Sequence, residues 1–185
     1  APRPARRGRG LDGQAEARLR AQGYALVAGV DEVGRGPLAG PVVAAAVILP
    51  ESWDDPGVDD SKRLPAAQRQ RLARHIQATA LAWGLGLVQA EEIDRLNIHQ
   101  ASLLAMSRAV ESLGTRPDYL LVDGRFVLRL AIAQRAVVGG DGSVASVAAA
   151  SILAKVHRDG LMEDWHAQWP AYNFAANKGY GTDEH

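Results

Sequence analysis

The sequence predicts an α/β protein in which a mixed five-stranded sheet is flanked by helices. Two apolar runs, residues 24–30 and 42–49, are bounded and contain several β-branched residues, which is typical of buried strands. About ten residues separate them, too few for a helical crossover, so these strands should pair antiparallel. Later strand-like runs alternate with segments of helical spacing. The resulting order, β-β-α-β-α-β-β-α, favours a mixed sheet with helices on its faces.

Local signals place the first helices and the third strand. Weak helical spacing predicts a helix over residues 11–22. A second helix, over residues 65–79, begins with a proline, which the first helical turn tolerates. Residues 81–90 predict the third strand, although Gly84 and Gly86 should weaken it because glycine packs poorly in a strand interior.

The second half of the chain contains two capping signals. Asn97 and Ser143 each offer a side-chain oxygen that can cap the helix after it. In order, the elements predicted here are a short helix at residues 90–96, a helix at 97–113, strands at 118–124 and 131–138, and a long helix at 144–169.

Length and composition limit the organisation of the chain. With 185 residues, one domain is the default. Residues 1–13 are rich in arginine, glycine and proline, as in a disordered tail. We therefore expect a single folded domain over residues 14–185.

Composition also excludes several classes of protein. No apolar run approaches the roughly 18 residues that a membrane-spanning helix needs, and no apolar segment follows the N-terminal arginines as it would in a signal peptide. The chain has no cysteine, which excludes disulfides and thiolate sites and agrees with a cytoplasmic protein. Lys and Arg together number 21, as do Asp and Glu, so the net charge favours no partner.

Four acidic residues lie at the ends of predicted buried elements. Asp31 and Glu32 follow the first strand, and Asp123 ends the fourth. Asp141 comes just before the long helix. If the first and fourth strands are parallel neighbours, Asp31 and Asp123 meet at one edge of the sheet. Charges about 4 Å apart repel by roughly 4 kcal/mol at an effective dielectric constant of about 20, so we expect a cation there. Oxygen ligands favour Mg²⁺ or Mn²⁺, and two such ions support phosphoryl transfer.

The first two acids are followed by a glycine-rich loop. Consecutive strand residues point to opposite faces, so Asp31 and Glu32 should reach one site only if the strand ends or bulges there, which Gly34 would permit. The Gly34–Gly36 segment offers bare backbone N–H groups and the guanidinium of Arg35, which suit phosphate or hydroxyl groups. The sequence therefore predicts a cation site and a phosphate site close together.

Several longer motifs run from about Tyr24 to the last residue. They are G-V-D-E-V-G-R-G-P-L-A-G-P-V-V-A-A-A-V, D-S-K-R-L, L-L-V-D-G, S-V-A-A-A-S-I-L-A-K-V-H-R-D and N-K-G-Y-G-T. Together they resemble bacterial ribonuclease HII. The resemblance implies a ribonuclease-H-like fold and Mg²⁺- or Mn²⁺-dependent hydrolysis of RNA joined to DNA. It implies cleavage on the 5′ side of a ribonucleotide, including single ribonucleotides in duplex DNA, with 3′-hydroxyl and 5′-phosphate products.

The resemblance also implies roles for individual residues. Those that match the family's metal-binding acids are Asp31, Glu32, Asp123 and Asp141. Asp159 would be an acid that supports them without binding the metal. The residues expected to bind substrate are Gly34, Arg35 and Gly36 at the ribose 2′-hydroxyl and its phosphate, Tyr180 at the next sugar, and Ser61 and Lys62 at other phosphates.

The chain departs from the family pattern in two places. The family often has K-G-D-A-K-S around the fourth acid, where this chain has G-G-D-G-S-V and so lacks a basic phosphate contact. Relatives continue beyond K-G-Y-G-T into a further helix that we expect to be absent here. The implied partners are RNA–DNA hybrids and ribonucleotide-containing duplexes, bound by a monomer. Two alternatives remain: another two-metal nuclease of this fold, such as a junction resolvase, or a duplex-binding module without activity.

Overall fold

The computed structural model describes residues 14–53, 58, 64–183 and 185. The predicted tail at residues 1–13 and the predicted phosphate contacts Ser61 and Lys62 lie outside the described residues. Among the helices in the described ranges, none is long and apolar enough to cross a membrane.

The strands form one mixed five-stranded sheet, as predicted, in the order β3-β2-β1-β4-β5. Their bounds are β1 Val27–Val33, β2 Val42–Ile48, β3 Ala82–Val88, β4 Tyr119–Asp123 and β5 Ala133–Val137. The first three pair antiparallel in sequence order, whereas β1 with β4 and β4 with β5 are parallel. This confirms that the first and fourth strands are parallel neighbours.

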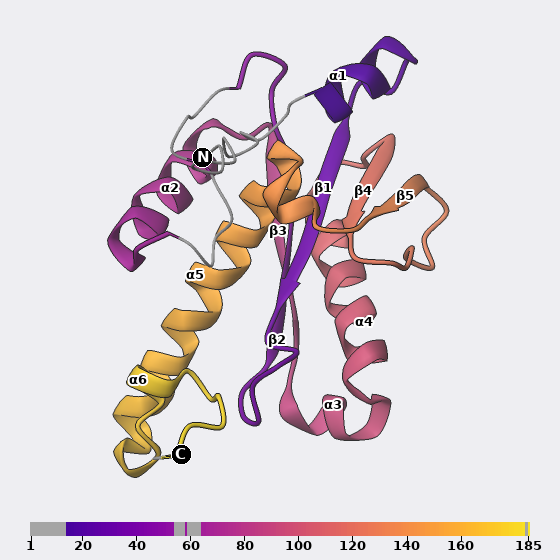
Figure 1. Ribbon diagram of the computed structural model, residues 1–185. Coiled ribbons are helices and arrows are strands. Elements are labelled where there is room, and N and C mark those ends of the chain that lie inside the picture. Colours follow the sequence, from indigo (N-terminus) through magenta and orange to yellow (C-terminus); the bar gives the residue numbers. More distant parts are fainter. Residues whose placement is uncertain (1–13, 54–57, 59–63, 184) are drawn as a thin grey trace, which may run out of the picture.

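Helices cover both faces of the sheet (Figure 1). One face carries α2 (Ala66–Thr79) and α5 (Ala145–Gln168), and the other carries α4 (Ile98–Glu111). The shorter elements are α1 Gln14–Ala21, α3 Ala90–Leu96, α6 Phe174–Asn177 and the 3₁₀ helices η1 Gly140–Gly142 and η2 Pro170–Tyr172. The predicted cap of α4 is confirmed, because the side chain of Asn97 accepts the N–H groups of His99 and Gln100.

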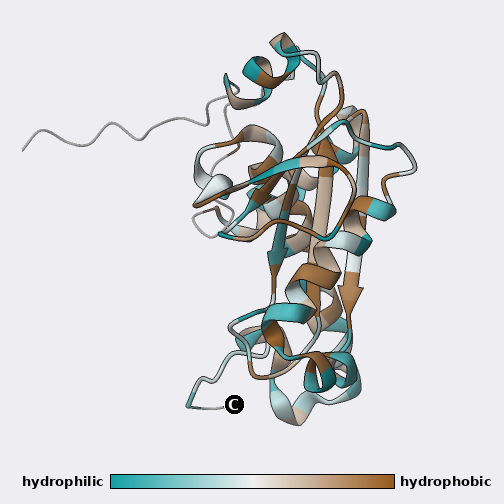
Figure 2. Cartoon of the chain, turned by 90° about the vertical axis from the view of Figure 1, so that its right-hand side faces the viewer, coloured by the Kyte–Doolittle hydropathy of each residue, from teal (hydrophilic) through white to brown (hydrophobic). Residues whose placement is uncertain are grey.

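Strand β2 shows the effect of two helical layers. Its odd-numbered residues from Val43 to Val47 pack on the side of α2 and α5, and its even-numbered residues from Ala44 to Ile48 pack on the side of α4. Alternate strand residues face opposite ways, so a strand covered on both faces must be apolar throughout, and all of β2 is buried. The helices, with one face in water, combine hydrophilic and hydrophobic residues (Figure 2).

Glycines in the strands allow the helices to approach closely. A Cβ atom on Gly29 of β1 would lie 2.2 Å from the backbone carbon of Ser146 in α5. A Cβ on Gly86 of β3 would lie 2.1 Å from the carbonyl oxygen of Ala105 in α4. Gly84 and Gly86 do not interrupt β3, since both keep their regular pairing with β2. Their role is close helix packing, and it compensates for the side chains they lack.

The start of α5 differs from the prediction. Ser143 does not cap this helix, because Val144 occupies the N-cap position and the Ser143 hydroxyl donates to the carbonyl of Gly139 instead, at 2.9 Å. Glu16 of α1 supplies the cap from a distant part of the chain. Its Oε1 accepts the backbone N–H of Ser146 at 2.8 Å and the Ser146 hydroxyl at 2.7 Å. A carboxylate is well placed at a helix N-terminus, where unpaired N–H groups collect.

Candidate functional site

Asp31 and Asp123 meet because of the register of β1 on β4. The last paired residues are Val30 and Val122, and the next residue on each strand is an acid. β4 ends at Asp123, whereas β1 continues to Val33 with only β2 beside it. The space beyond the end of β4 is therefore the place where the carboxylates gather.

The prediction that β1 ends or bulges at its two acids is wrong. Asp31 pairs with Ala45 and Glu32 with Ala44 in regular antiparallel register. Even so, Asp31, Glu32 and Asp123 each place one carboxylate oxygen within 4.8 Å of the others. We attribute this to the open edge of β1. Because no β4 backbone separates the two faces there, side chains that leave from opposite faces can turn toward the same space.

Burial makes the charged form of these carboxylates unfavourable in the metal-free protein. Loss of hydration raises the pKa of Asp31 well above its usual range, and the charges of Glu32 and Asp123 raise it further. A hydrogen bond from Ser151 of α5 opposes the rise, and the N–H of Glu32 also donates to Asp31, at 2.7 Å. Burial likewise raises the pKa of Glu32, and the nearby Arg35 guanidinium acts in the other direction. A cation in the cluster would reverse both shifts.

The donor atoms of the cluster fit a hard divalent cation. Glu32 Oε1 lies 3.3 Å from a guanidinium nitrogen of Arg35. Glu32 Oε2 is buried and has no hydrogen-bond partner among the described residues. An unpaired buried acceptor costs about 1–3 kcal/mol, which coordination to a cation would remove. Carboxylate oxygens are the ligands that Mg²⁺ and Mn²⁺ prefer.

Asp141, the fourth predicted acid, lies beside the cluster. It is part of η1, and its neighbour Gly140 donates its N–H to Asp123 Oδ1 at 2.7 Å. Within the described chain, the set of mutually close carboxylates is Asp31, Glu32 and Asp123. The structure thus brings three of the four predicted acids together and holds the fourth in a turn that is hydrogen-bonded to the third.

The loop at residues 34–41, called the substrate loop because it contains the predicted contacts Gly34, Arg35 and Gly36, docks on a C-terminal segment, residues 177–181. The two lie side by side at the lower end of the molecule in Figure 1. The backbone N–H groups of Leu38 and Ala39 both donate to the carbonyl of Gly179, at 2.9 and 3.2 Å. The fold therefore joins two segments that are separated by most of the chain.

Side chains from each segment cover glycines of the other. Tyr180 Cε1 lies 3.4 Å from the point where a Cβ on Gly36 would be. Leu38 Cδ1 lies 3.0 Å from the equivalent point on Gly181. This reciprocal contact brings Gly36 and Tyr180 together, as expected if both face one nucleotide.

A buried arginine, Arg158 of α5, holds the two segments together by hydrogen bonds to the backbone of both. Its side chain is fully buried. Its guanidinium donates to the carbonyls of Pro41 at 3.0 Å and Ala39 at 2.9 Å in the substrate loop, and to that of Lys178 at 2.8 Å in the C-terminal segment. Burial lowers the pKa of Arg158, yet arginine stays charged at neutral pH. Three carbonyl dipoles therefore take the place of an anion.

Gly34 and Gly36 differ in whether the protein itself requires glycine at the position. Gly34 is buried with a φ of +106°, and a Cβ there would lie 2.5 Å from the carbonyl oxygen of Pro41. Its conformation and packing are thus needed by the protein itself. Gly36 is exposed, and the nearest atom to an added Cβ is in ordinary contact. Arg35 is exposed as well, so of the three residues predicted to bind substrate in this loop, Arg35 and Gly36 are the ones that a substrate can reach.

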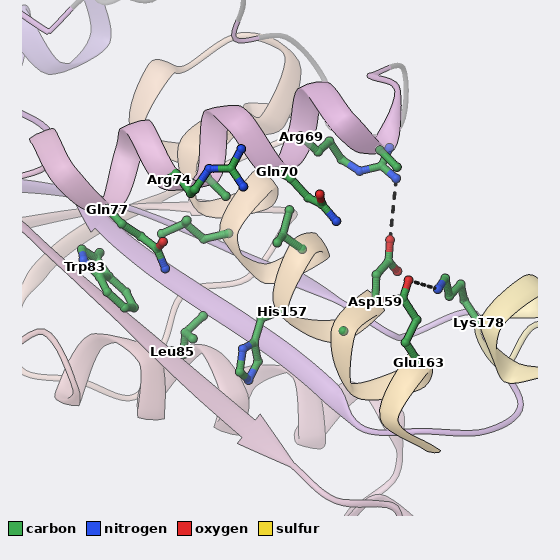
Figure 3. Close-up of a pocket in the computed structure, with 15 residues that line it drawn as sticks. Arg69, Gln70, Arg74, Gln77, Trp83, Leu85, His157, Asp159, Glu163 and Lys178 are labelled. Atoms are coloured by element: carbon green, nitrogen blue, oxygen red, sulfur yellow. Dashed lines mark hydrogen bonds and ion pairs between the residues drawn. The ribbon is translucent and has the colours of Figure 1, made fainter. Parts of the chain in front are cut away.

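Asp159 lies apart from the carboxylate cluster. It borders a pocket of about 370 Å³ between α2, α5 and β3, which none of the clustered acids lines. It forms an ion pair with Lys155 at 2.7 Å. A second ion pair joins it to Arg69 of α2 at 3.6 Å (Figure 3). Ser151, which contacts Asp31, is eight residues earlier on the same helix, about 12 Å away. The structure therefore places Asp159 where it links α5 to α2.

Sequence reasoning assigned no role to Arg158 and none to Glu16. A signal for Arg158 exists, because it follows the buried residues Val147, Ser151 and Ala154 at helical spacing. A charge on that apolar face indicates a buried partner. Glu16 had no such signal, since its partner Ser146 is 130 residues away.

The chain is similar to known ribonucleases of the HII type. Residues 28–185 match the family model of ribonuclease HII. The ribonuclease HII of Syntrophus aciditrophicus (strain SB) is 55% identical over 163 residues, which is 88% of this chain and 77% of that protein. The solved ribonuclease H2 of Pyrococcus horikoshii OT3 has a TM-score of 0.74 at 29% identity, and covers 85% of this chain and 82% of its own. The ribonuclease HII of Archaeoglobus fulgidus, solved in complex with PCNA, has a TM-score of 0.71 at 27% identity, covering 85% and 83%.

Proposed function

The chain belongs to the ribonuclease HII family, and from this premise we propose that it nicks duplex DNA on the 5′ side of an embedded ribonucleotide. It is a metal-dependent endonuclease of RNA joined to DNA, and the RNA strand of longer hybrids is the second proposed substrate. The products would carry 3′-hydroxyl and 5′-phosphate ends. The observation that supports this best is the carboxylate cluster directly preceding the loop that packs on Tyr180.

The proposed metal ligands are Asp31, Glu32, Asp123 and Asp141, and Mg²⁺ or Mn²⁺ is the proposed cofactor. Two bound ions would promote attack of water on the phosphodiester and stabilise the leaving oxygen. The chain itself orients the ligands. Ser151 bonds to Asp31, and the Gly140 N–H bonds to Asp123, so these carboxylates are held before an ion arrives. Such preorganisation lowers the cost of binding.

The choice of a ribonucleotide depends on its 2′-hydroxyl, which both donates and accepts hydrogen bonds. Arg35 and Gly36 are exposed beside the cluster, and Tyr180, a residue 42% exposed, places its ring next to Gly36. We propose that this backbone bonds the hydroxyl while the ring packs on the following sugar. A site built for a hydroxyl rejects the analogue without it by roughly 10⁴-fold, because its own polar groups are left unpaired.

The proposed partner is nucleic acid, either an RNA–DNA hybrid or a DNA duplex that contains ribonucleotides, bound by one copy of the chain. Ser61 and Lys62 stay proposed phosphate contacts, and Asp159 a proposed supporting acid that acts through α5. A cytoplasmic location and a part in the removal of ribonucleotides from DNA follow from the same resemblance.

The proposal is tested with a labelled DNA duplex that contains one ribonucleotide, incubated with Mg²⁺, with Mn²⁺ or with EDTA. We expect one nick on the 5′ side of the ribonucleotide with either ion and none with EDTA. An all-DNA duplex and an all-DNA four-way junction serve as controls and should stay intact. Cleavage of the junction, or no cleavage of the first duplex with either ion, would contradict the proposal.

The proposed recognition of the ribonucleotide by Gly36 and Tyr180 is tested with the variants Gly36→Ala and Tyr180→Ala. The added methyl of Gly36→Ala fits the protein, so a loss of activity would report on substrate approach; Gly34→Ala is unsuitable because it strains the loop. We expect Tyr180→Ala to lose about 10- to 100-fold in kcat/KM on the single-ribonucleotide duplex, as for the loss of one stacking contact. Gly36→Ala should lose a similar factor, because its methyl keeps the sugar away from the backbone. The matched control is Gly160→Ala on α5, where an added Cβ meets nothing within 4 Å. Wild-type rates in both Gly36→Ala and Tyr180→Ala would show that these residues do not recognise the ribonucleotide.

A further inference from the structure

Leu38 is the most exposed of the large apolar residues in the described chain, at 81%, and yet it is firmly held. Its own N–H and that of Ala39 donate to the carbonyl of Gly179. Arg158 donates to the carbonyl of Ala39. Exposure of a single leucine is common and needs no explanation by itself. A leucine presented to water on a backbone fixed from two sides is arranged for contact with something else.

The position of Leu38 relates it to the proposed sugar site. Leu38 lies over Gly181, and Tyr180, the preceding residue, lies over Gly36. Both side chains therefore emerge where the substrate loop meets the C-terminal segment, and both remain partly open to solvent. Tyr180 has a hydroxyl, whereas Leu38 offers no hydrogen-bonding group at all.

We propose that Leu38 packs against a deoxyribose of the bound duplex next to the sugar that Tyr180 contacts. The inference rests on the proposed function. Deoxyribose presents an apolar C2′ methylene, which leucine can cover favourably. A ribose at the same place would bring a 2′-hydroxyl that loses its water without gaining a partner. Leu38 would thus favour a deoxyribonucleotide at this flanking position, while the backbone at Gly36 binds the 2′-hydroxyl of the ribonucleotide itself.

The experiment compares wild type, Leu38→Ala and a matched control, Leu81→Ala. Leu81 is also an exposed leucine, at 59%, and lies between α2 and β3. The substrates are the single-ribonucleotide duplex and a series in which a second 2′-hydroxyl is placed at each flanking nucleotide in turn. Cleavage at the original site is followed by product length. This is a double-mutant cycle between one side chain and one hydroxyl.

On the single-ribonucleotide duplex, Leu38→Ala should raise KM roughly tenfold with kcat nearly unchanged, because uniform binding is lost. In wild type and Leu81→Ala, a 2′-hydroxyl at one flanking position should lower kcat/KM by roughly tenfold. Leu38→Ala should lose most of that sensitivity at that position only. Equal sensitivity in all three proteins, or an unchanged KM, would overturn the inference. An inactive wild type would instead overturn the proposed function.

Discussion

The fold treats two groups of buried charge, the carboxylate cluster and Arg158, in opposite ways. The carboxylates of Asp31, Glu32 and Asp123 are crowded together, and one oxygen of Glu32 has no partner among the described residues. Arg158 is buried even more completely than Asp31, but three carbonyls accept its hydrogen bonds. The cluster needs a cation to balance its charge, whereas the hydrogen bonds of the arginine are already made within the protein.

This difference distinguishes charged groups that bind a ligand from charged groups that stabilise the fold. The acids are destabilising until an ion arrives, since like charges in a buried site repel. Arg158 is stabilising at all times, because it joins the substrate loop to the C-terminal segment. Opposite effects on stability should therefore follow when each kind of charge is removed.

The largest effect should come from the cluster and should fall on activity. Asp31→Asn and Asp141→Asn should each lower cleavage by about 10³-fold or more, because the loss of a ligand charge weakens the ion site. The metal-free Asp31→Asn protein should melt at a higher temperature than wild type. Nicking assays and thermal unfolding in EDTA measure the two effects. Full activity in either variant would show that its carboxylate is not a metal ligand.

Substitution of Arg158 should affect activity less than loss of a cluster acid, and it should lower the stability of the protein rather than raise it. Arg158→Met should lower the free energy of unfolding by about 3 kcal/mol, since three buried carbonyls lose a charged donor. It should also raise KM for the single-ribonucleotide duplex, because Gly36 and Tyr180 are no longer held together. Arg158→Lys keeps the charge but not the planar fork, and should recover part of both losses.

Urea unfolding and steady-state kinetics check this prediction, and Mn²⁺ binding by calorimetry serves as the control. The carboxylate cluster should bind the ion as before in both variants. A protein that is less stable but has an unchanged KM would show that Arg158 supports the fold without positioning the loop.

The smallest effect concerns pH. Burial and like charges raise the pKa of Asp31 and Glu32 in the folded, metal-free protein. The folded state then holds protons that the unfolded state releases above about pH 4, so stability is lost as pH rises toward the raised folded pKa values. The slope is at most about 1.4 kcal/mol per pH unit for each proton.

This dependence is isolated by comparing wild type with Asp31→Asn. In EDTA, the stability advantage of Asp31→Asn should be small near pH 4 and larger at neutral pH. Added Mg²⁺ or Mn²⁺ should stabilise wild type most at neutral pH. An advantage that is independent of pH would mean that Asp31 is not the group that titrates.

The sequence by itself determined the elements and the acids. Apolar periodicity identified the strands and helices, and Asn97 capped α4 as expected, because both signals are local. The sequence placed Asp31 and Asp123 at one sheet edge only on the condition that the first and fourth strands are parallel neighbours, and the structure meets that condition. The family motifs added the substrate loop and Tyr180.

Only the tertiary structure decided how these parts are held. The cap of α5 comes from Glu16 rather than from the adjacent Ser143, and the clamp on the substrate loop comes from Arg158. Asp31 and Glu32 reach one site from a regular strand because β4 ends beside them. The physical reason is shared: a buried polar group must find a partner, but sequence alone does not tell which distant atom that partner will be.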